Sequence, residues 1–156
     1  MRILEQQLYH ATKLKNIPSI QNEGLRAGSF VTRLEVLAEY YAETIEDEGQ
    51  KAVILVIDTQ GLDFEFLPDS LGLEEPIASV LRNELGLNEK DIEPLWLSTN
   101  GSGSDCMKLI GSAICAKSIP PHAMSVGEVG EAGDAVALMD YRIECPFSLV
   151  SASNIA

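Results

Sequence analysis

Basic residues are scarce in this chain, and their scarcity argues against whole classes of partner. Over 156 residues, 11 lysines and arginines stand against 24 aspartates and glutamates, which gives a net charge of −13. A surface that binds nucleic acid needs lysine and arginine to neutralise phosphates. The sequence therefore disfavours nucleic acid and anionic lipid as partners. Its acidity fits either a solvated acidic face or a basic protein partner.

Cysteine pairs, metal-ligand spacings and long apolar runs are missing as well. The three cysteines are odd in number and show no C-x-x-C spacing, so they indicate neither a disulfide framework nor a zinc site. We interpret Cys106, Cys115 and Cys145 as buried thiols in a reducing compartment. No stretch approaches the roughly 18 apolar residues of a membrane span, and residues 1–5 contain no signal-peptide pattern. We therefore expect a cytoplasmic protein with no membrane contact and no bound metal.

The length of the chain predicts a single domain that covers residues 1–156. A chain of this size buries roughly 68–70% of its extended surface, and a hydrophobic fraction of 46% is typical of a globular protein. Along the chain the patterns read strand, helix, strand, helix, then mostly strands with one inserted helix. That order predicts an α+β fold in which short helices flank two small sheets.

Local signals in the first third of the chain predict two helices with defined ends. Asn16 is placed to cap the first helix, and Gly24 is placed to end it, because glycine readily adopts positive φ. Thr32 and Glu35 have the spacing of a capping box, so we expect the second helix to begin there and to run to about Glu48. Strands are predicted at 8–11 and from residue 30.

The rest of the chain is predicted to be mainly extended. The β-branched run 52–57 indicates a central strand covered on both faces, and the alternation at 62–67 indicates a half-buried or edge strand. Pro76 is expected to open a helix that reaches Leu85. The segment 101–105 is predicted as a flexible loop and lacks the lysine of a phosphate-binding loop. Further strands are expected at 94–98, 112–116, 119–126 and 135–145, with an acidic turn at 127–133.

Two blocks near the start of the chain contain short motifs in a recognisable order. The run Leu8-Tyr9-His10-Ala11-Thr12, an Ile-x-x-Ile helix and Gly24-Leu25 resemble the opening of the ADP-ribosyltransferase fold. Diphtheria-toxin-like enzymes, poly-ADP-ribose polymerases and RNA 2'-phosphotransferases share that opening. Phe30-Val31-Thr32, followed by Ala38 and Tyr41, resembles the second motif of the diphtheria-toxin-like enzymes.

A third block extends the resemblance to roughly residues 7–126. It runs from Ser112 to Ile119 and looks like the late strand of the family, and Pro120-Pro121 resembles its continuation in the phosphotransferases. The resemblance implies a split β-sheet core flanked by short helices, with NAD bound as a substrate in the cleft.

The resemblance also implies a set of site residues. In the family, a histidine hydrogen-bonds the nicotinamide-side ribose and a helix tyrosine stacks on the nicotinamide; these positions are His10 and Tyr41 here. A glutamate normally begins the late strand, but this chain has Ser112 there. The implied catalytic set is therefore His10, Tyr41 and Ser112. The implied NAD-binding residues are His10, Ala11, Thr12, Thr32, Arg33 and Tyr41.

Three functions follow from this resemblance and its departure from the family pattern. Serine cannot supply the negative charge that stabilises a cationic transition state, so poly-ADP-ribosylation is not expected. The first hypothesis is an NAD-dependent mono-ADP-ribosyltransferase that acts on a macromolecule or on water. The alternative is a catalytically inactive member of the fold that binds a nucleotide or a protein partner. An RNA 2'-phosphotransferase ranks below both, because the segment 46–51 is acidic and has no arginine.

Simpler interpretations stand beside these roles. His10 on an apolar strand also fits a core histidine, and Tyr40 replaces Tyr41 if the helix register shifts by one residue. Arg26 and Arg33 could bind a pyrophosphate bidentately or form surface ion pairs. Cys106 has no activating histidine near it in sequence, which argues against a thiol nucleophile.

Overall fold

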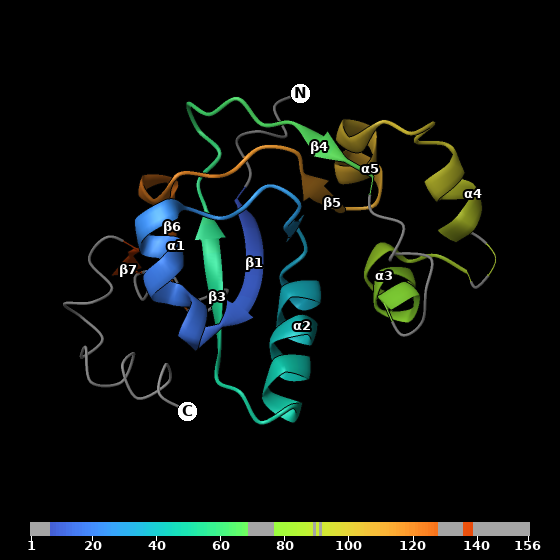
Figure 1. Ribbon diagram of the computed structural model, residues 1–156. Coiled ribbons are helices and arrows are strands. Elements are labelled where there is room, and N and C mark those ends of the chain that lie inside the picture. The colour runs from blue at the N-terminus through green and yellow to red at the C-terminus, as the bar shows by residue number, and fades with distance from the viewer. Residues whose placement is uncertain (1–6, 69–76, 89, 91, 128–135, 139–156) are drawn as a thin grey trace.

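The computed structural model describes residues 7–68, 77–88, 90, 92–127 and 136–138 (Figure 1). Seven strands form one sheet in the order β4-β5-β2-β1-β3-β6-β7, and every neighbouring pair is antiparallel. The strands are β1 (Leu8–Lys13), β2 (Phe30–Thr32), β3 (Ala52–Ile57), β4 (Phe66–Leu67), β5 (Ser112–Cys115), β6 (Met124–Val126) and β7 (Val136–Ala137). The helices are α1 (Ile17–Glu23), α2 (Glu35–Asp47), α3 (Ile77–Leu85), α4 (Ile92–Leu97) and α5 (Gly103–Leu109), with 3-10 turns η2 (Leu14–Asn16) and η4 (Pro121–Ala123).

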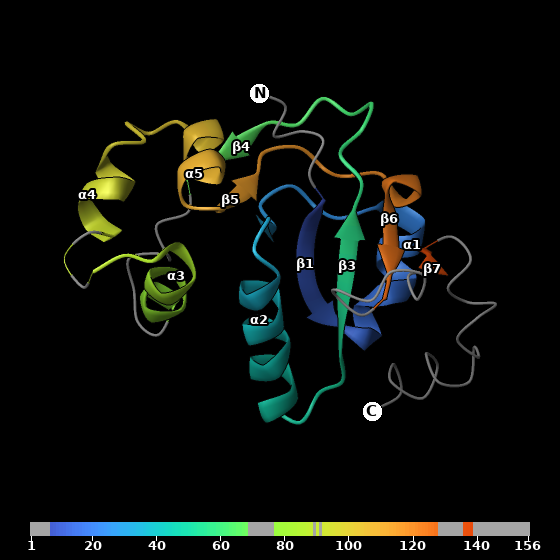
Figure 2. The same cartoon turned by 180° about the vertical axis from the view of Figure 1, so that it is seen from behind.

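This arrangement confirms the predicted α+β class and corrects the number of sheets. We expected two small sheets, but hydrogen bonds join all the strands into one. The joint between β1 and β2 is narrow, because its register contains the single pair Tyr9–Thr32, whereas β1 and β3 share six consecutive pairs. We call β1, β3, β6 and β7 with α1 and α2 the β1 half. We call β2, β4 and β5 with α3, α4 and α5 the β5 half (Figure 2).

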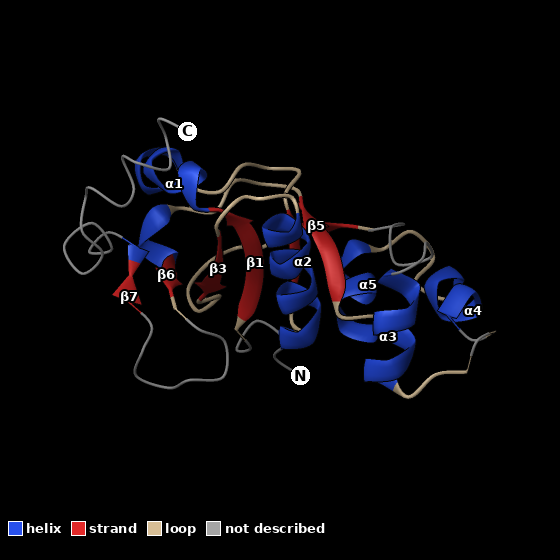
Figure 3. Cartoon of the chain, turned by 90° about the horizontal axis from the view of Figure 1, so that it is seen from below, coloured by secondary structure: helices blue, strands red, loops and turns tan. Residues whose placement is uncertain are grey.

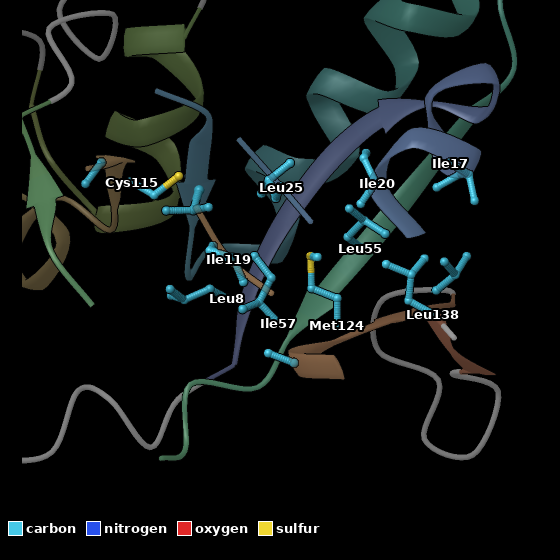
Figure 4. Close-up of a cluster of buried hydrophobic side chains, with 14 of the residues drawn as sticks. Leu8, Ile17, Ile20, Leu25, Leu55, Ile57, Cys115, Ile119, Met124 and Leu138 are labelled. Carbon is cyan, nitrogen blue, oxygen red and sulfur yellow. The ribbon is translucent and has the colours of Figure 1, made fainter. Parts of the chain in front are cut away.

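The main core lies on the face of the sheet that α1 and η4 cover. Leu8, Leu55 and Ile57 project from the strands and pack against Ile17 and Ile20 of α1 (Figure 4). Burying a leucine or isoleucine side chain fully contributes roughly 1.5–3 kcal/mol, so this cluster is a large source of stability. It explains why α1 keeps its isoleucines one turn apart.

Helix α2 lies against the opposite face of the β1 half. Its Ala38 is fully buried against Tyr9 and Val56, where a small side chain lets the helix approach the strands. Leu34 and Leu37 lie on a neighbouring stripe and join a second cluster with α3, α4 and α5. Seen from below, α2 lies between β1 and the helices of the β5 half (Figure 3). It therefore packs against both halves.

Several predicted elements are confirmed with small changes. Residues 52–57 form a central strand, although only Leu55–Ile57 is fully buried. The alternation at 62–67 is real, but only Phe66–Leu67 is paired, at the edge of the sheet. Cys106 and Cys115 are buried free thiols, as expected. Cys145, the turn at 128–133 and most of the predicted strand 135–145 lie outside the described residues.

The segment 94–98 is not a strand. Residues 94–97 belong to α4, where Pro94 is tolerated because it stands in the first turn, and Ser98 lies in the turn that follows. The apolar run Leu95-Trp96-Leu97 favoured a strand locally, but Leu95 and Trp96 pack into the second cluster as parts of a helix. Tertiary packing overrides the local preference at this position.

The predicted loop 101–105 is wrong for its second part, because α5 begins at Gly103. Ser102 caps this helix, with its Oγ accepting a hydrogen bond from the amide of Asp105 at 3.2 Å. A Cβ atom at Gly103 would lie 1.9 Å from the carbonyl oxygen of Phe66. The glycine that suggested a loop is therefore required for the close approach of α5 to β4.

The predicted capping box does not form. Helix α2 starts at Glu35, and the Oγ1 of Thr32 accepts a hydrogen bond from the amide of Leu34 at 3.0 Å and donates to the carbonyl of Gly111 at 2.6 Å. The predicted side-chain cap at Asn16 is also wrong, because its amide donates to Thr12 Oγ1 at 3.1 Å.

Gly24 ends α1 as predicted. Its φ is +84° and its amide donates to the carbonyl of Ile20. The adjacent Leu25 then pairs with Ile119 across an isolated bridge. No helix within the described residues is long and apolar enough to cross a membrane.

Candidate functional site

The candidate site is the narrow joint between the two halves. β1 and β2 are paired at Tyr9–Thr32 and not beyond it. The imidazole of His10, the next residue of β1, bonds through Nδ1 to the carbonyl of Phe30. A carbonyl oxygen can only accept, so Nδ1 carries the proton and the neutral ring presents Nε2 as an acceptor. The side chain of His10 thus connects the strands where their backbone ladder ends.

The surroundings of His10 favour this neutral form. Burial lowers its pKa from the ordinary value, and the hydrogen bond to Phe30 opposes the shift without cancelling it. The ring is therefore uncharged near neutral pH. An uncharged imidazole with Nδ1 engaged can accept a hydrogen bond from a ligand hydroxyl at Nε2.

Three half-buried aromatic rings continue from His10 towards α2. The centroid of the Phe30 ring lies 6.5 Å from that of His10 and 4.5 Å from that of Tyr41, and Tyr40 lies 5.7 Å from Tyr41. Such separations are typical of favourable aromatic pairs. Phe30 therefore occupies part of the space that the sequence analysis assigned to a pocket between His10 and Tyr41.

Phe30 is a site residue that the sequence analysis did not single out. The available signal was its place directly before Val31-Thr32, inside a block already assigned to the site. Of the two tyrosines on α2, Tyr41 rather than Tyr40 makes the described ring contact with Phe30.

Thr32 and Ser112 face each other across β2 and β5 and are nearly inaccessible, with 0% and 3% of their surfaces exposed. Both bonds of the Thr32 hydroxyl are made within the protein. The carbonyl of Ser112 accepts a bond from the thiol of Cys106 at 3.2 Å. These bonds show that the Thr32 hydroxyl stabilises the structure of the joint. The catalytic role of Ser112 stays a prediction.

Glu35 supplies a carboxylate close to the joint. Its Oε1 accepts a hydrogen bond from the hydroxyl of Tyr9 at 3.2 Å, and its side chain is exposed. Burial, followed by the charge and hydrogen bond of Glu35, raises the pKa of Tyr9. The sequence analysis assigned Glu35 to the capping box and therefore missed this contact. Two other acids, Glu93 and Asp105, lie in the first turns of α4 and α5.

The side chain of Arg33 forms hydrogen bonds to the backbone of the protein. Its Nε donates to the carbonyl of Met107 at 3.2 Å and its Nη2 donates to the carbonyl of Lys108 at 3.1 Å. These carbonyls belong to the last turn of α5, where helices leave acceptors without partners. The guanidinium thus caps α5, and a role for Arg33 in binding pyrophosphate stays a prediction.

The other two predicted NAD-binding residues follow His10 along β1. Ala11 is half-buried, and Thr12 is buried with its Oγ1 bonded to Asn16. Alternation along the strand places Thr12 on the same face as His10 and Ala11 on the other face. The structure thus places the Phe30 ring next to both His10 and Tyr41, and it bonds Arg33 to the end of α5.

Comparisons with protein-family models, curated proteins and solved structures find no match to this chain. A function for this chain must therefore be inferred from the chemistry of the β1–β2 joint. It offers one neutral imidazole acceptor, a row of aromatic rings and a nearby exposed carboxylate.

Proposed function

We propose that this chain is an ADP-ribosyltransferase-like protein that binds NAD at the β1–β2 joint and transfers ADP-ribose to a macromolecular acceptor. The observation that carries the proposal is the bond from His10 Nδ1 to the carbonyl of Phe30, at the point where the strands part. That bond fixes the tautomer and directs the acceptor function to Nε2. It supports the ribose-binding role that the sequence resemblance implies for His10.

Each part of NAD has a counterpart in this arrangement. A ribose hydroxyl can donate to Nε2 of His10, and the positively charged nicotinamide ring can stack on the rings of Phe30 and Tyr41. Cleavage of the bond between nicotinamide and ribose releases nicotinamide and leaves a cation-like ribose for the acceptor to attack. The acceptor, the cytoplasmic location and the biological role are parts of the proposal that rest on the sequence alone.

A second candidate function is NAD binding without turnover. The observation that favours it is Ser112, which is uncharged and 3% exposed where the family places its glutamate. Without a carboxylate at that position, the largest stabilising contribution to the transition state is missing. An RNA 2'-phosphotransferase activity is disfavoured further, because Arg33 is bonded to the carbonyls of α5.

Calorimetric titration with NAD, run in parallel with an assay for released nicotinamide, tests both candidates. We expect binding that weakens about tenfold in Tyr41→Ala, because one stacked ring contributes roughly 1–1.5 kcal/mol. Tyr41→Phe keeps the ring and should bind within about twofold of wild type.

The two candidates differ in turnover. Nicotinamide release that disappears in His10→Ala supports the transferase, and binding without release supports the inactive alternative. Absence of NAD binding by a folded protein would overturn both. Substitution of the exposed His122 by glutamine is the matched control, since it removes the only other histidine.

A further inference from the structure

A recess of about 100 Å³ opens where the segment leading into β4 passes the turn after β5. Its walls are 62–65 and 117–120. It shares no residue with the site at the β1–β2 joint. Its function is therefore a separate question from the binding of NAD.

The inner wall of the recess is apolar and fixed in place. Ile119 is buried, and Leu62 and Phe64 pack against the main core cluster. The ring of Phe64 also stacks on that of Phe66, with 5.8 Å between their centroids. An apolar group entering the recess would meet side chains that the core already holds in position.

The rim of the recess carries a net negative charge. Asp63 and Glu65 stand on one side, and Lys117 places its Nζ 3.5 Å and 3.9 Å from their carboxylates. All three side chains are more than half exposed, at 90%, 59% and 54%. Exposed ion pairs of this kind are weak, so another cation can replace the ammonium of Lys117.

The size of the recess restricts the class of ligand. Sites for nucleotides and comparable small molecules enclose roughly 300–1,000 Å³, which is several times larger. A lysine or arginine side chain has an apolar stem and a charged head, and these match the apolar wall and the acidic rim. The net charge of −13 attracts a basic partner and opposes a second copy of this chain.

We propose that this recess binds a lysine or arginine side chain of a basic protein segment. The stem lies along Leu62 and Phe64, and the head pairs with Asp63 and Glu65 in competition with Lys117. The proposal does not depend on the binding of NAD at the joint.

A titration of isotope-labelled protein with a peptide of alternating arginine and alanine, followed by NMR at 0.15 M salt, tests the proposal. We expect the amides of 62–65 and 117–119 to shift with the peptide and not with its glutamate–alanine counterpart. The double variant Asp63→Asn/Glu65→Gln should bind about fivefold more weakly. Glu46→Gln/Asp47→Asn removes the same charge from the exposed end of α2 and should change affinity less than about twofold.

A second variant predicts a gain. Lys117→Met removes the competing ammonium and should strengthen binding about threefold, whereas Lys51→Met, an equal change of charge at another exposed position, should not. Equal effects of the paired variants would show unspecific attraction and overturn the proposal. So would shifts confined to other surfaces, absence of binding, or shifts of the recess with protein concentration alone, which would identify a second copy as the occupant.

Discussion

The two halves of the sheet are held together by different means. In the β1 half, β1 and β3 form a ladder of six consecutive pairs over a continuous core. In the β5 half the strands have two to four residues, and close backbone approach and bonds to carbonyl groups hold the helices in place. A long ladder tolerates the loss of one contact better than a short one. We therefore expect single substitutions to act more severely in the β5 half.

The substitution Gly103→Ala should give the largest effect. Its Cβ would lie 1.9 Å from the carbonyl oxygen of Phe66, which is backbone and cannot move aside without displacing β4. Overpacking of this kind costs about 3 kcal/mol. Urea denaturation measures the loss, with Ser104→Ala at the adjacent exposed position as the control. A midpoint equal to that of wild type would contradict the close approach of α5 and β4.

Gly24→Ala makes the corresponding test in the β1 half. The substitution combines a φ of +84° with a Cβ placed 2.3 Å from the carbonyl of Ile119, and we expect a loss of about 2 kcal/mol. Gly28 has a similar φ of +92° but open space around its Cβ, so Gly28→Ala should cost about 1 kcal/mol. If both variants lose the same stability, the contact with Ile119 contributes nothing.

Arg33→Met tests how α5 is held within the β5 half. It removes the two bonds to the end of α5, and the expected loss is about 1 kcal/mol in thermal or urea unfolding. Arg26→Met changes an exposed side chain by the same charge and should leave stability within about 0.5 kcal/mol of wild type. Equal stabilities of the two variants would show that the bonds of Arg33 to α5 do not stabilise the β5 half.

The smallest expected effect is a pH dependence that originates at the joint. Because folding lowers the pKa of His10, the unfolded chain binds more protons, and stability falls as pH drops through the ordinary value of 6.5 towards the folded value. The stabilising contribution is fully present above pH 6.5. The slope from this group cannot exceed about 1.4 kcal/mol per pH unit.

Unfolding curves recorded between pH 7.5 and pH 5 measure this slope. His10→Gln should reduce the fall in stability, and His122→Gln, which leaves His10 in place, should keep the wild-type fall. An unchanged slope in His10→Gln would show that another group causes the dependence.

The two halves also differ in how well their elements could be predicted from the sequence. β3 and the end of α1 at Gly24 could be predicted because their signals are local: a β-branched run and a glycine stop. α4 could not, because Trp96 favours a strand until the second cluster exists for it to pack against. α5 could not, because Gly103 is explained only by a backbone oxygen of β4, which is remote in sequence.

The residues of the candidate site also differ in how far the sequence predicts their surroundings. Motif order singled out His10 and Tyr41, and Phe30 was overlooked although it stands in the same block. Thr32, Glu35 and Arg33 carry polar groups whose partners are chosen by the tertiary structure. Thr32 and Arg33 bond to groups 74–79 positions away in the chain, and no local spacing rule predicts such partners.

The carbonyl oxygen of Gly111 has a further consequence. It accepts one bond from the Thr32 hydroxyl at 2.6 Å and another from the Arg33 amide at 2.9 Å, so both of its lone pairs are used. Its vibration is therefore sensitive to β2, to the turn before α2 and to the start of β5 together. An isotope label on this one carbonyl would act as a built-in spectroscopic reporter, whose infrared band shifts when β2 separates from β5.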